Sequence, residues 1–226
     1  MSSDVLVVDY GVGNLLSLGR ALQACGAQVE MSTNHARIID ADRIVLPGVG
    51  AFGSCMDALK RRELTGALET FIQNGKPLLG ICVGMQMLME HSEEFGDHQG
   101  LGIIPGRVAQ IPDTGSDGTP HKIPHIGWSG LFPHTDGTPW DDSILAGISP
   151  QSCCYFVHGY TAEPKSTIHI LAECDYDGRR LCAAVRSGNV TGTQFHPEKS
   201  GEIGLKILTN FLELPASLRF QDREYT

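Results

Sequence analysis

The segment KPLLGICVGMQML, residues 76–88, places a cysteine between two glycines where an apolar, strand-like run gives way to a helix-like pattern. Glycine has no Cβ, so Gly80 and Gly84 allow the chain to turn sharply from strand into helix. This G-x-nucleophile-x-G spacing is typical of a nucleophile elbow, in which a strained backbone presents a reactive side chain at the edge of a sheet. The segment favours an α/β fold, and it leaves two interpretations of Cys82 open, a nucleophile or a buried core sulfur.

Strand-like and helix-like segments alternate through the first part of the chain. Strands are predicted at 4–10, 27–32, 43–48 and 77–81, and helices at 14–23, 55–60, 63–74 and 85–91. This alternation predicts one α/β domain over residues 1–226, with a mostly parallel central sheet flanked by helices. Functional side chains are then expected at the carboxyl ends of the strands.

The pattern changes at Gly106, where short strand-like runs separated by turns begin. These runs predict an added antiparallel hairpin region, followed by an amphipathic helix at the end of the chain. Clusters of Gly, Ser, Thr, Asp and Pro at 113–120 and 133–142 are predicted to be surface loops.

Composition narrows the class of protein. The chain has a net charge of -9, which argues against binding nucleic acid or an anionic membrane. Its seven Cys residues are an odd number without a CxxC pair, so neither a zinc site nor a disulfide framework is predicted. Asp4 and Asp9 flank the first apolar run where a secretory signal would be basic, and we therefore expect a cytoplasmic protein without a membrane-spanning segment.

A thiol nucleophile requires a base and a group that orients the base. The segment TGTQFHPEKS, residues 191–200, supplies His196 and Glu198 directly after a strand-like run, with Pro197 stiffening the turn between them. These residues predict a Cys-His-Glu relay with Cys82. Taken alone, an HxE pair in a loop is more often an incidental surface feature.

Acyl chemistry also requires donors for a developing oxyanion. The segment LPGVGAFG, residues 46–53, ends the third predicted strand with glycines whose backbone amides can approach a ligand. The predicted donors are the amides of Gly50 and of Val83, the residue after the proposed nucleophile. An ordinary strand-to-helix turn is the alternative for residues 46–53.

Three of these segments, PGVGAF, GICVGMQ and QFHPEKS, resemble in order and spacing the class I glutamine amidotransferases. VDYGVGNLLS, IPHIGW and YFVHGY make the chain similar, within that family, to the glutaminase subunits of imidazole glycerol phosphate synthase from histidine biosynthesis. The resemblance covers essentially the whole chain. It implies a flavodoxin-like fold and hydrolysis of glutamine to glutamate and ammonia by a cysteine nucleophile, with no cofactor and no metal.

The resemblance also implies roles for individual residues. Cys82 attacks the glutamine amide carbon to form a glutamyl thioester, His196 passes the proton to the departing ammonia and then activates water, and Glu198 orients His196. The residues that the resemblance assigns to substrate binding are Gly48, Gln86, Glu94, Tyr155 and His158. A polar residue near a helix start is the alternative for Gln86, and a hydrogen-bonded core histidine is the alternative for His158.

A partner follows from the same resemblance. Family members deliver ammonia to a separate (β/α)8 cyclase subunit, which makes imidazole glycerol phosphate and aminoimidazole carboxamide ribotide, so a heterodimer with an ammonia channel is expected. Asn14, Trp128 and Lys199 are expected to face this partner, although a partly buried aromatic is nearly as good an interpretation of Trp128. Family members are nearly silent alone, and the loop at 47–50 is the expected mobile element.

Other functions share some of these features. Class I glutaminases that feed anthranilate, GMP or pyridoxal phosphate synthesis carry the same triad, but YFVHGY and DYGVGN favour the histidine pathway. Gly159 departs from the Ser or Thr usual in the family. A non-catalytic small-molecule or nucleotide-binding module is a further alternative, but Leu16 replaces the third glycine of a dinucleotide loop.

Two last possibilities are disfavoured by the residues themselves. A metal site built from His121, His125 and His134 lacks a carboxylate at helical spacing. A triad retained without catalysis is also disfavoured, because nucleophile, base and orienting carboxylate are all present.

Overall fold

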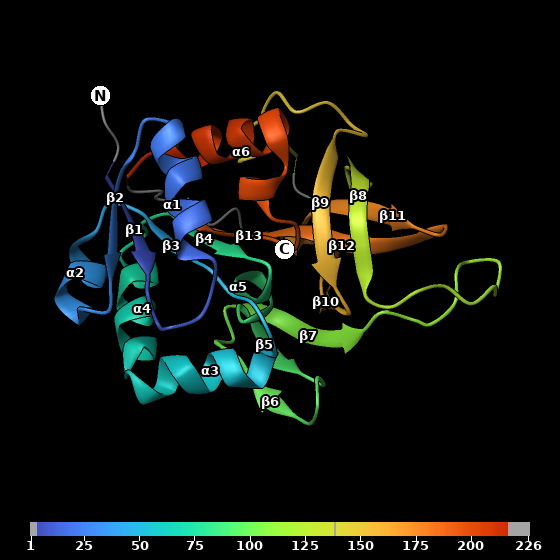
Figure 1. Ribbon diagram of the computed structural model, residues 1–226, viewed down its shortest axis with the longest axis horizontal. Coiled ribbons are helices and arrows are strands. Elements are labelled where there is room, and N and C mark those ends of the chain that lie inside the picture. Colours follow the sequence, from blue (N-terminus) through green and yellow to red (C-terminus); the bar gives the residue numbers. More distant parts are fainter. Residues whose placement is uncertain (1–3, 138, 217–226) are drawn as a thin grey trace, which may run out of the picture.

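The computed structural model describes residues 4–137 and 139–216, and its main element is a nine-stranded sheet (Figure 1). The strands follow the order β2-β1-β3-β4-β13-β12-β11-β8-β9. The five strands from β2 to β13 are mutually parallel, which confirms the α/β architecture predicted from the sequence. These strands are β1 (Asp4–Val8), β2 (Gln28–Ser32), β3 (Ile44–Leu46), β4 (Leu78–Ile81) and β13 (Val190–Thr193).

Helices cover both faces of the parallel strands. Figure 1 shows α1 (Leu15–Ala24) and α6 (Gly201–Glu213) on one face, and α3 (Phe52–Arg61) and α4 (Leu64–Gln73) on the other, with the short α2 (His35–Asp40) packed against α4. The core between the layers is formed by apolar side chains of the buried strands and the inward faces of these helices. Within the described residues, no helix combines the length and apolar character needed to cross a bilayer.

The second half of the chain extends the same sheet with antiparallel strands. β12 pairs with β13 and β11, and β8 joins β11 to the edge strand β9. The predicted hairpin region is therefore confirmed, and it shares the hydrogen-bonded sheet of the parallel half. Its strands are β8 (His125–Phe132), β9 (Cys153–His158), β11 (Ile170–Tyr176) and β12 (Arg179–Ser187), with the 3-10 turn η1 (Thr167–His169) before β11.

A second sheet of four strands, in the order β10-β7-β5-β6, lies beside α3 (Figure 1). Its strands are β5 (Met89–Ser92), β6 (His98–Gln99), β7 (Ile104–Gln110) and β10 (Tyr160–Pro164). The helix predicted over residues 85–91 is wrong, because α5 spans only Val83–Gln86 and β5 follows it. The carbonyl of Met87 accepts from Leu101 N (2.8 Å) and that of Leu88 from Ile104 N (3.0 Å), so they bind a segment distant in sequence instead of continuing a helix.

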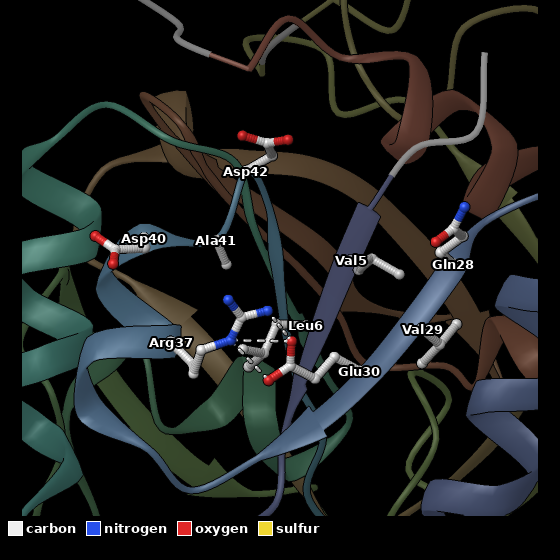
Figure 2. A pocket seen from close by; sticks show the side chains of 9 residues that line it. All are labelled: Val5, Leu6, Gln28, Val29, Glu30, Arg37, Asp40, Ala41 and Asp42. Carbon is white, nitrogen blue, oxygen red and sulfur yellow. Dashed lines mark hydrogen bonds and ion pairs between the residues drawn. The ribbon is translucent and has the colours of Figure 1, made fainter.

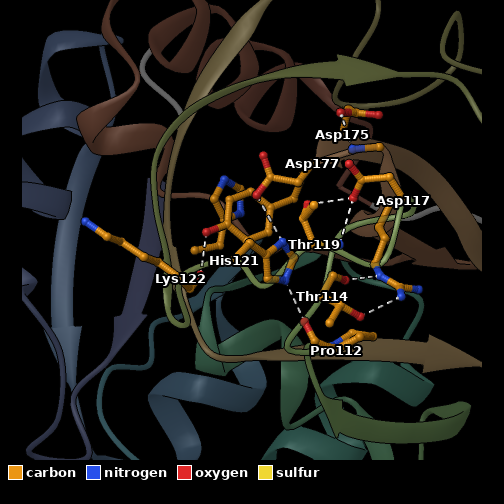
Figure 3. A network of polar contacts seen from close by, with 12 residues as sticks. Pro112, Thr114, Asp117, Thr119, His121, Lys122, Asp175 and Asp177 are labelled. Carbon is orange, nitrogen blue, oxygen red and sulfur yellow. Dashed lines mark hydrogen bonds and ion pairs between the residues drawn. The ribbon is translucent and has the colours of Figure 1, made fainter.

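The polar loop at residues 113–120 folds back onto the turn between β11 and β12 (Figure 3). Arg179 donates to the backbone carbonyl of Thr114, and Arg179 Nη2 also lies 3.2 Å from the Thr114 hydroxyl. His121 Nδ1 lies 3.0 Å from the carboxylate of Asp177. The insert is thus a surface loop, as predicted, and side-chain contacts fasten it to the antiparallel part of the sheet.

The last helix packs closely against the short 3-10 turn η2 (Pro197–Lys199), which follows β13. At Gly204 of α6, a Cβ would lie 1.9 Å from the carbonyl oxygen of Pro197. The absence of a side chain at this position therefore sets the distance between α6 and the turn that carries Glu198.

We predict that Gly204→Ala lowers the free energy of unfolding by about 1–3 kcal/mol, because the added methyl group overlaps backbone that cannot move freely. The matched control is Gly66→Ala in α4, where a Cβ would have no other atom within 4 Å. Gly66→Ala should raise stability by roughly 0.5–1 kcal/mol through helix propensity alone. Urea denaturation measures both, and shifts of the same sign would contradict this account.

Candidate active site

Cys82 occupies a sharp turn between β4 and α5, with a backbone φ of 56° and ψ of -114°. A residue with a side chain seldom adopts positive φ, so the backbone is strained at the position of the proposed nucleophile. A Cβ on Gly80 would lie 2.6 Å from the carbonyl oxygen of Gly84, and one on Gly84 would lie 2.0 Å from that of Leu46. Both glycines of the elbow are therefore required by close backbone approach.

Strand β13 brings the distant half of the predicted triad to this turn. It pairs in parallel with β4, and Cys82 N donates to the carbonyl oxygen of Thr193 at 2.7 Å. Beyond the end of β13, His196 Nδ1 lies 2.8 Å from Glu198 Oε1, and both side chains are 5% exposed. The structure thus places the imidazole and carboxylate at the carboxyl end of the strand next to the elbow.

The electrostatics of His196 reflect these contacts. Burial alone lowers the pKa of His196, but its hydrogen bonds to Cys82 and Glu198, together with the charges of both partners, raise the pKa to about 9. The protonated imidazole is therefore favoured while it faces the sulfur and the carboxylate.

A cavity of about 310 Å³ opens over the elbow. Its lining residues are Val49, Gly50, Cys82, Val83, Gln86, Glu94, Pro124, Val157, His158, Gly159, Tyr160 and His196. Those that the sequence analysis singled out for chemistry or substrate binding are Gly50, Cys82, Val83, Gln86, Glu94, His158 and His196. A small, concave space faced by a thiol, an imidazole, an amide and a carboxylate is suited to a polar small molecule.

The loop after β3 forms one wall of this cavity. Tyr10 Oη donates to the carbonyl oxygen of Pro47 (2.5 Å), and Cys55 Sγ donates to that of Val49 (3.4 Å). Phe52 N, at the start of α3, donates to the carboxylate of Glu94 at 2.6 Å. Glu94, which lies two residues after β5, thus lines the cavity and also fastens the start of α3, where the loop ends.

The two glycines of this loop have different roles. Gly50 has a φ of +88° and is one of the residues that line the cavity over the elbow. Gly48 is buried beneath the wall, where a Cβ would lie 2.4 Å from Gly84 N. Its backbone supports the peptide that follows Val83, and Gly48 is not among the residues that line the cavity.

Gln86 and Gln194 form a buried amide pair beside the sulfur. Gln86 Nε2 lies 3.0 Å from the carbonyl oxygen of Tyr160 and 3.0 Å from Gln194 Oε1. Gln194 Nε2 lies 3.8 Å from Cys82 Sγ. Sequence reasoning missed Gln194 and the Tyr160 carbonyl; a polar side chain at the end of a buried strand was the only available signal for Gln194, and a backbone carbonyl gives none.

His158 is held by hydrogen bonds on both ring nitrogens. Nδ1 lies 2.8 Å from the carbonyl oxygen of Tyr160, and Nε2 lies 3.1 Å from His125 Nδ1. Burial lowers the pKa of His158 to about 3, and the neighbouring imidazoles act in the same direction. His158 is therefore neutral near pH 7, with its proton on Nδ1, because the carbonyl can only accept.

Tyr155 lies outside the cavity. Its ring centroid is 6.0 Å from that of Trp128, and Lys199 Nζ is 5.8 Å from it. Trp128 is 57% exposed and Ile126, on the same strand, is 59% exposed. The structure thus groups Tyr155, assigned to the substrate from sequence, with two of the residues assigned to a partner surface; the third, Asn14, caps α1 by accepting from a backbone amide.

The histidines considered for a metal site have separate partners. His125 Nε2 contacts Ser129 Oγ at 2.9 Å, His121 contacts Asp177, and His134 Nδ1 accepts from the backbone amide of Asp136 at 3.2 Å. Across residues 4–137 and 139–216, no cluster of His, Cys, Asp and Glu has the arrangement of a metal site.

A second cavity, of about 340 Å³, lies by the edge strand β2 and α2 (Figure 2). The side chains of Arg37 and Glu30 point toward each other there and form an ion pair. None of the described residues that line it is a cysteine or histidine: Val5, Leu6, Gln28, Val29, Glu30, Arg37, Asp40, Ala41 and Asp42. The cavity over Cys82 is therefore the better candidate for covalent chemistry.

Comparison with known proteins agrees with this geometry. Residues 6–214 match the family described as Glutamine amidotransferase class-I. An "Imidazole glycerol phosphate synthase subunit HisH 1" of Legionella pneumophila (strain Lens) is 47% identical over 94% of this chain and 100% of its own length. The subunit HisH of Syntrophotalea carbinolica is 42% identical over 92% of this chain and 98% of its own length.

Solved structures support the fold. PurLQS from Thermotoga maritima superposes with a TM-score of 0.71 at 21% identity, covering 94% of this chain and 98% of that one. A glutamine amidotransferase superposes with a TM-score of 0.69 at 16% identity, covering 92% and 97% of the two chains. These similarities agree with the strained backbone at Cys82, the buried His196–Glu198 pair and the cavity beside them. They establish that the chain belongs to the class I glutamine amidotransferases and, within them, to the HisH subunits of imidazole glycerol phosphate synthase.

Proposed function

We propose that this protein is the glutaminase subunit of imidazole glycerol phosphate synthase and releases ammonia from glutamine for histidine biosynthesis. The observation that carries the proposal is the meeting of Cys82, at its strained turn, with the buried His196–Glu198 pair at one cavity. That arrangement supplies the nucleophile, the proton carrier and the orienting carboxylate of acyl transfer.

The reaction begins with the thiolate of Cys82 attacking the carboxamide carbon of glutamine. Protonated His196 gives its proton to the amide nitrogen, and the carbon–nitrogen bond breaks. Ammonia departs, and the glutamyl group stays bound to the sulfur as a thioester. Neutral His196 then takes a proton from water, whose oxygen attacks the thioester, and glutamate leaves as the thiolate re-forms. Glu198 holds Nδ1 at 2.8 Å throughout, which keeps Nε2 available for both proton transfers.

The oxyanion formed in both steps requires donors beside the elbow. Val83 follows Cys82 directly, and Val83 and Gly50 both line the cavity. We assign both as oxyanion donors. Removing one donor of this kind typically reduces kcat by about 100- to 1,000-fold.

Substrate recognition is assigned to the polar side chains of the same cavity. Gln86 and Glu94 line it, and the side-chain oxygen of Gln86 and the carboxylate of Glu94 can bind the polar groups of glutamine. His158 also lines the cavity, but both of its ring nitrogens are hydrogen-bonded, so its contribution is to fix the Tyr160 carbonyl. Gly48 contributes indirectly, by holding the wall against the elbow. Tyr155 lies outside the cavity, and its contribution is to hold the base, since its backbone carbonyl accepts from His196 N at 3.0 Å.

Ammonia released here requires an acceptor, and we propose a heterodimer with the cyclase subunit of the synthase. The exposed side chains Trp128, Ile126 and Lys199 lie around Tyr155, directly outside the His196 turn, and suit a protein partner. Asn14 is exposed at the start of α1, beside η2, and is assigned to the same surface.

We also propose a cytoplasmic location. All seven cysteines are free thiols, the state that a reducing compartment maintains.

Cys82→Ala should abolish glutamine-dependent product formation when the variant is assayed with the cyclase subunit. Product formed from added ammonium should remain near wild-type levels, because the partner's site is untouched. Chromatography of the product under both conditions measures this. Retention of glutamine-dependent activity would refute Cys82 as the nucleophile.

Glu198→Gln should move the alkaline limb of the kcat/KM profile to lower pH. The pKa of His196 is raised to about 9 in the folded protein. Its proton therefore stabilises the folded site fully at pH values below the ordinary histidine pKa near 6.5, and this stabilisation is lost as the pH rises through about 9. Removing the carboxylate lowers that pKa, so the proton for the leaving ammonia is lost earlier. Initial rates of glutamate release, measured at pH values about half a unit apart between about pH 6 and pH 10, test this. An alkaline limb that does not shift would contradict the role of Glu198.

Trp128→Ala should weaken the complex with the cyclase subunit by about tenfold or more, as expected for a central exposed aromatic at an interface. Met31→Ala is the matched control, because Met31 is 40% exposed on β2, at the opposite edge of the nine-stranded sheet from β9. Isothermal titration calorimetry gives both dissociation constants. Equal values for the two variants would exclude the β8 surface as the interface.

A further inference from the structure

We propose that Gln194 is a positioning residue of the glutaminase reaction, which donates a side-chain N–H to Cys82 Sγ and so favours the thiolate and fixes its direction. Gln194 is fully buried and lies two residues before the base, directly after β13. The inference rests on the proposed function, but it concerns the chemical state of the sulfur and can be tested without turnover.

The polarity of the amide pair follows from one backbone carbonyl. The oxygen of Tyr160 can only accept a hydrogen bond, so the Gln86 atom 3.0 Å from it is Nε2. The same Nε2 lies 3.0 Å from Gln194, whose facing atom must therefore be the acceptor Oε1. Gln194 is left with its NH₂ group directed at Cys82 Sγ, at 3.8 Å.

The Tyr160 carbonyl is itself fixed from its other side. His158 Nδ1 donates to it at 2.8 Å, and His158 Nε2 accepts from His125 Nδ1 at 3.1 Å. His125 Nε2, which then lacks a proton, accepts from Ser129 Oγ at 2.9 Å. Every hydrogen bond in this chain therefore donates in one direction, from Ser129 on β8 towards the Tyr160 carbonyl. If the Gln86 amide were reversed, its oxygen would face that carbonyl oxygen, and two acceptors would meet.

A donor aimed at sulfur acts differently on the two states of the thiol. A hydrogen bond to a charged acceptor is about twice as strong as one to a neutral acceptor. The Gln194 N–H therefore stabilises the thiolate more than the thiol, and it does so from a different residue than the His196 imidazole. It also restrains the sulfur position during formation and hydrolysis of the thioester.

The test uses Gln194→Glu and Gln194→Met in the full chain. Glu keeps an acceptor for Gln86 Nε2 but presents no N–H to sulfur at neutral pH, whereas Met of similar length provides neither group. Peptide-resolved mass spectrometry follows alkylation of Cys82 by iodoacetamide from pH 5 to pH 10, about the range over which thiols ionise. Exposed Cys153 in the same samples serves as an internal reference.

We expect the pH of half-maximal Cys82 alkylation to rise by about one unit or more in both variants, with Cys153 unchanged. In the complex with the cyclase subunit, Gln194→Glu should lower kcat by about tenfold with KM for glutamine within about twofold of wild type. Gln194→Met should change kcat and KM together, because Gln86 loses the acceptor Gln194 Oε1 and keeps only the Tyr160 carbonyl.

Asn210→Asp is the matched control for replacing a buried amide by an acid. Asn210 Nδ2 donates to the carbonyl oxygens of Ile144 and Ala146, both at 2.9 Å, without touching the site. Its substitution should lower thermal stability and leave the Cys82 alkylation midpoint unchanged. The midpoint of Gln194→Met decides the matter if Gln194→Glu fails to fold.

An unchanged Cys82 midpoint in a folded Gln194 variant would overturn the inference. So would an equal shift in Asn210→Asp, which would mark the effect as general destabilisation. Failure of wild-type protein with its partner to release glutamate would instead overturn the proposed function, since the alkylation profile is measured without glutamine.

Discussion

Parallel strands β4 and β13 lie side by side, with Ile81 paired with Thr193, and the catalytic geometry depends on that register. Because parallel strands end at the same edge of a sheet, the residue after β4 and the residues after β13 must meet. Cys82 N donates to Thr193 O, which ties the elbow to β13 directly. The intervening chain forms the second sheet and the antiparallel strands, which supply the remaining walls of the cavity.

The strained backbone at Cys82 is maintained by the packing of the residues around it. A non-glycine residue at positive φ costs on the order of 1–3 kcal/mol. Strand β4 is buried along its whole length, and close contacts of Gly80 and Gly84 leave the backbone no room to relax. The energy of the packed core thus holds the sulfur over the cavity, where His196 and Gln194 approach it from β13.

Strand β9 carries residues of the cavity, Val157 and His158, and a residue of the proposed partner surface, Tyr155. Its side chains alternate, so Phe156 and His158 are buried while Tyr155 and Val157 are less so. His158 therefore supports the cavity through the Tyr160 carbonyl, whereas the Tyr155 ring faces Trp128 and Lys199. One strand thus connects the proposed partner surface to the amide pair beside the nucleophile.

The sequence alone determined the parallel strands and the glycine-flanked turn at Cys82, because apolar periodicity and glycine spacing are local properties of the chain. It predicted a triad of Cys82, His196 and Glu198, but only the tertiary structure brings the distant histidine and glutamate to that turn. It did not determine β5, because the run at 85–91 fits a helix equally well until Leu101 and Ile104 donate to the carbonyls of Met87 and Leu88 and β5 pairs with β7. Nor did it determine the side of β9 on which Tyr155 lies or the contact of Gln194 with Cys82, since both depend on contacts between distant segments. Tertiary structure decided these points because a side chain's partners are set by packing, and local pattern specifies only the strand or helix that carries it.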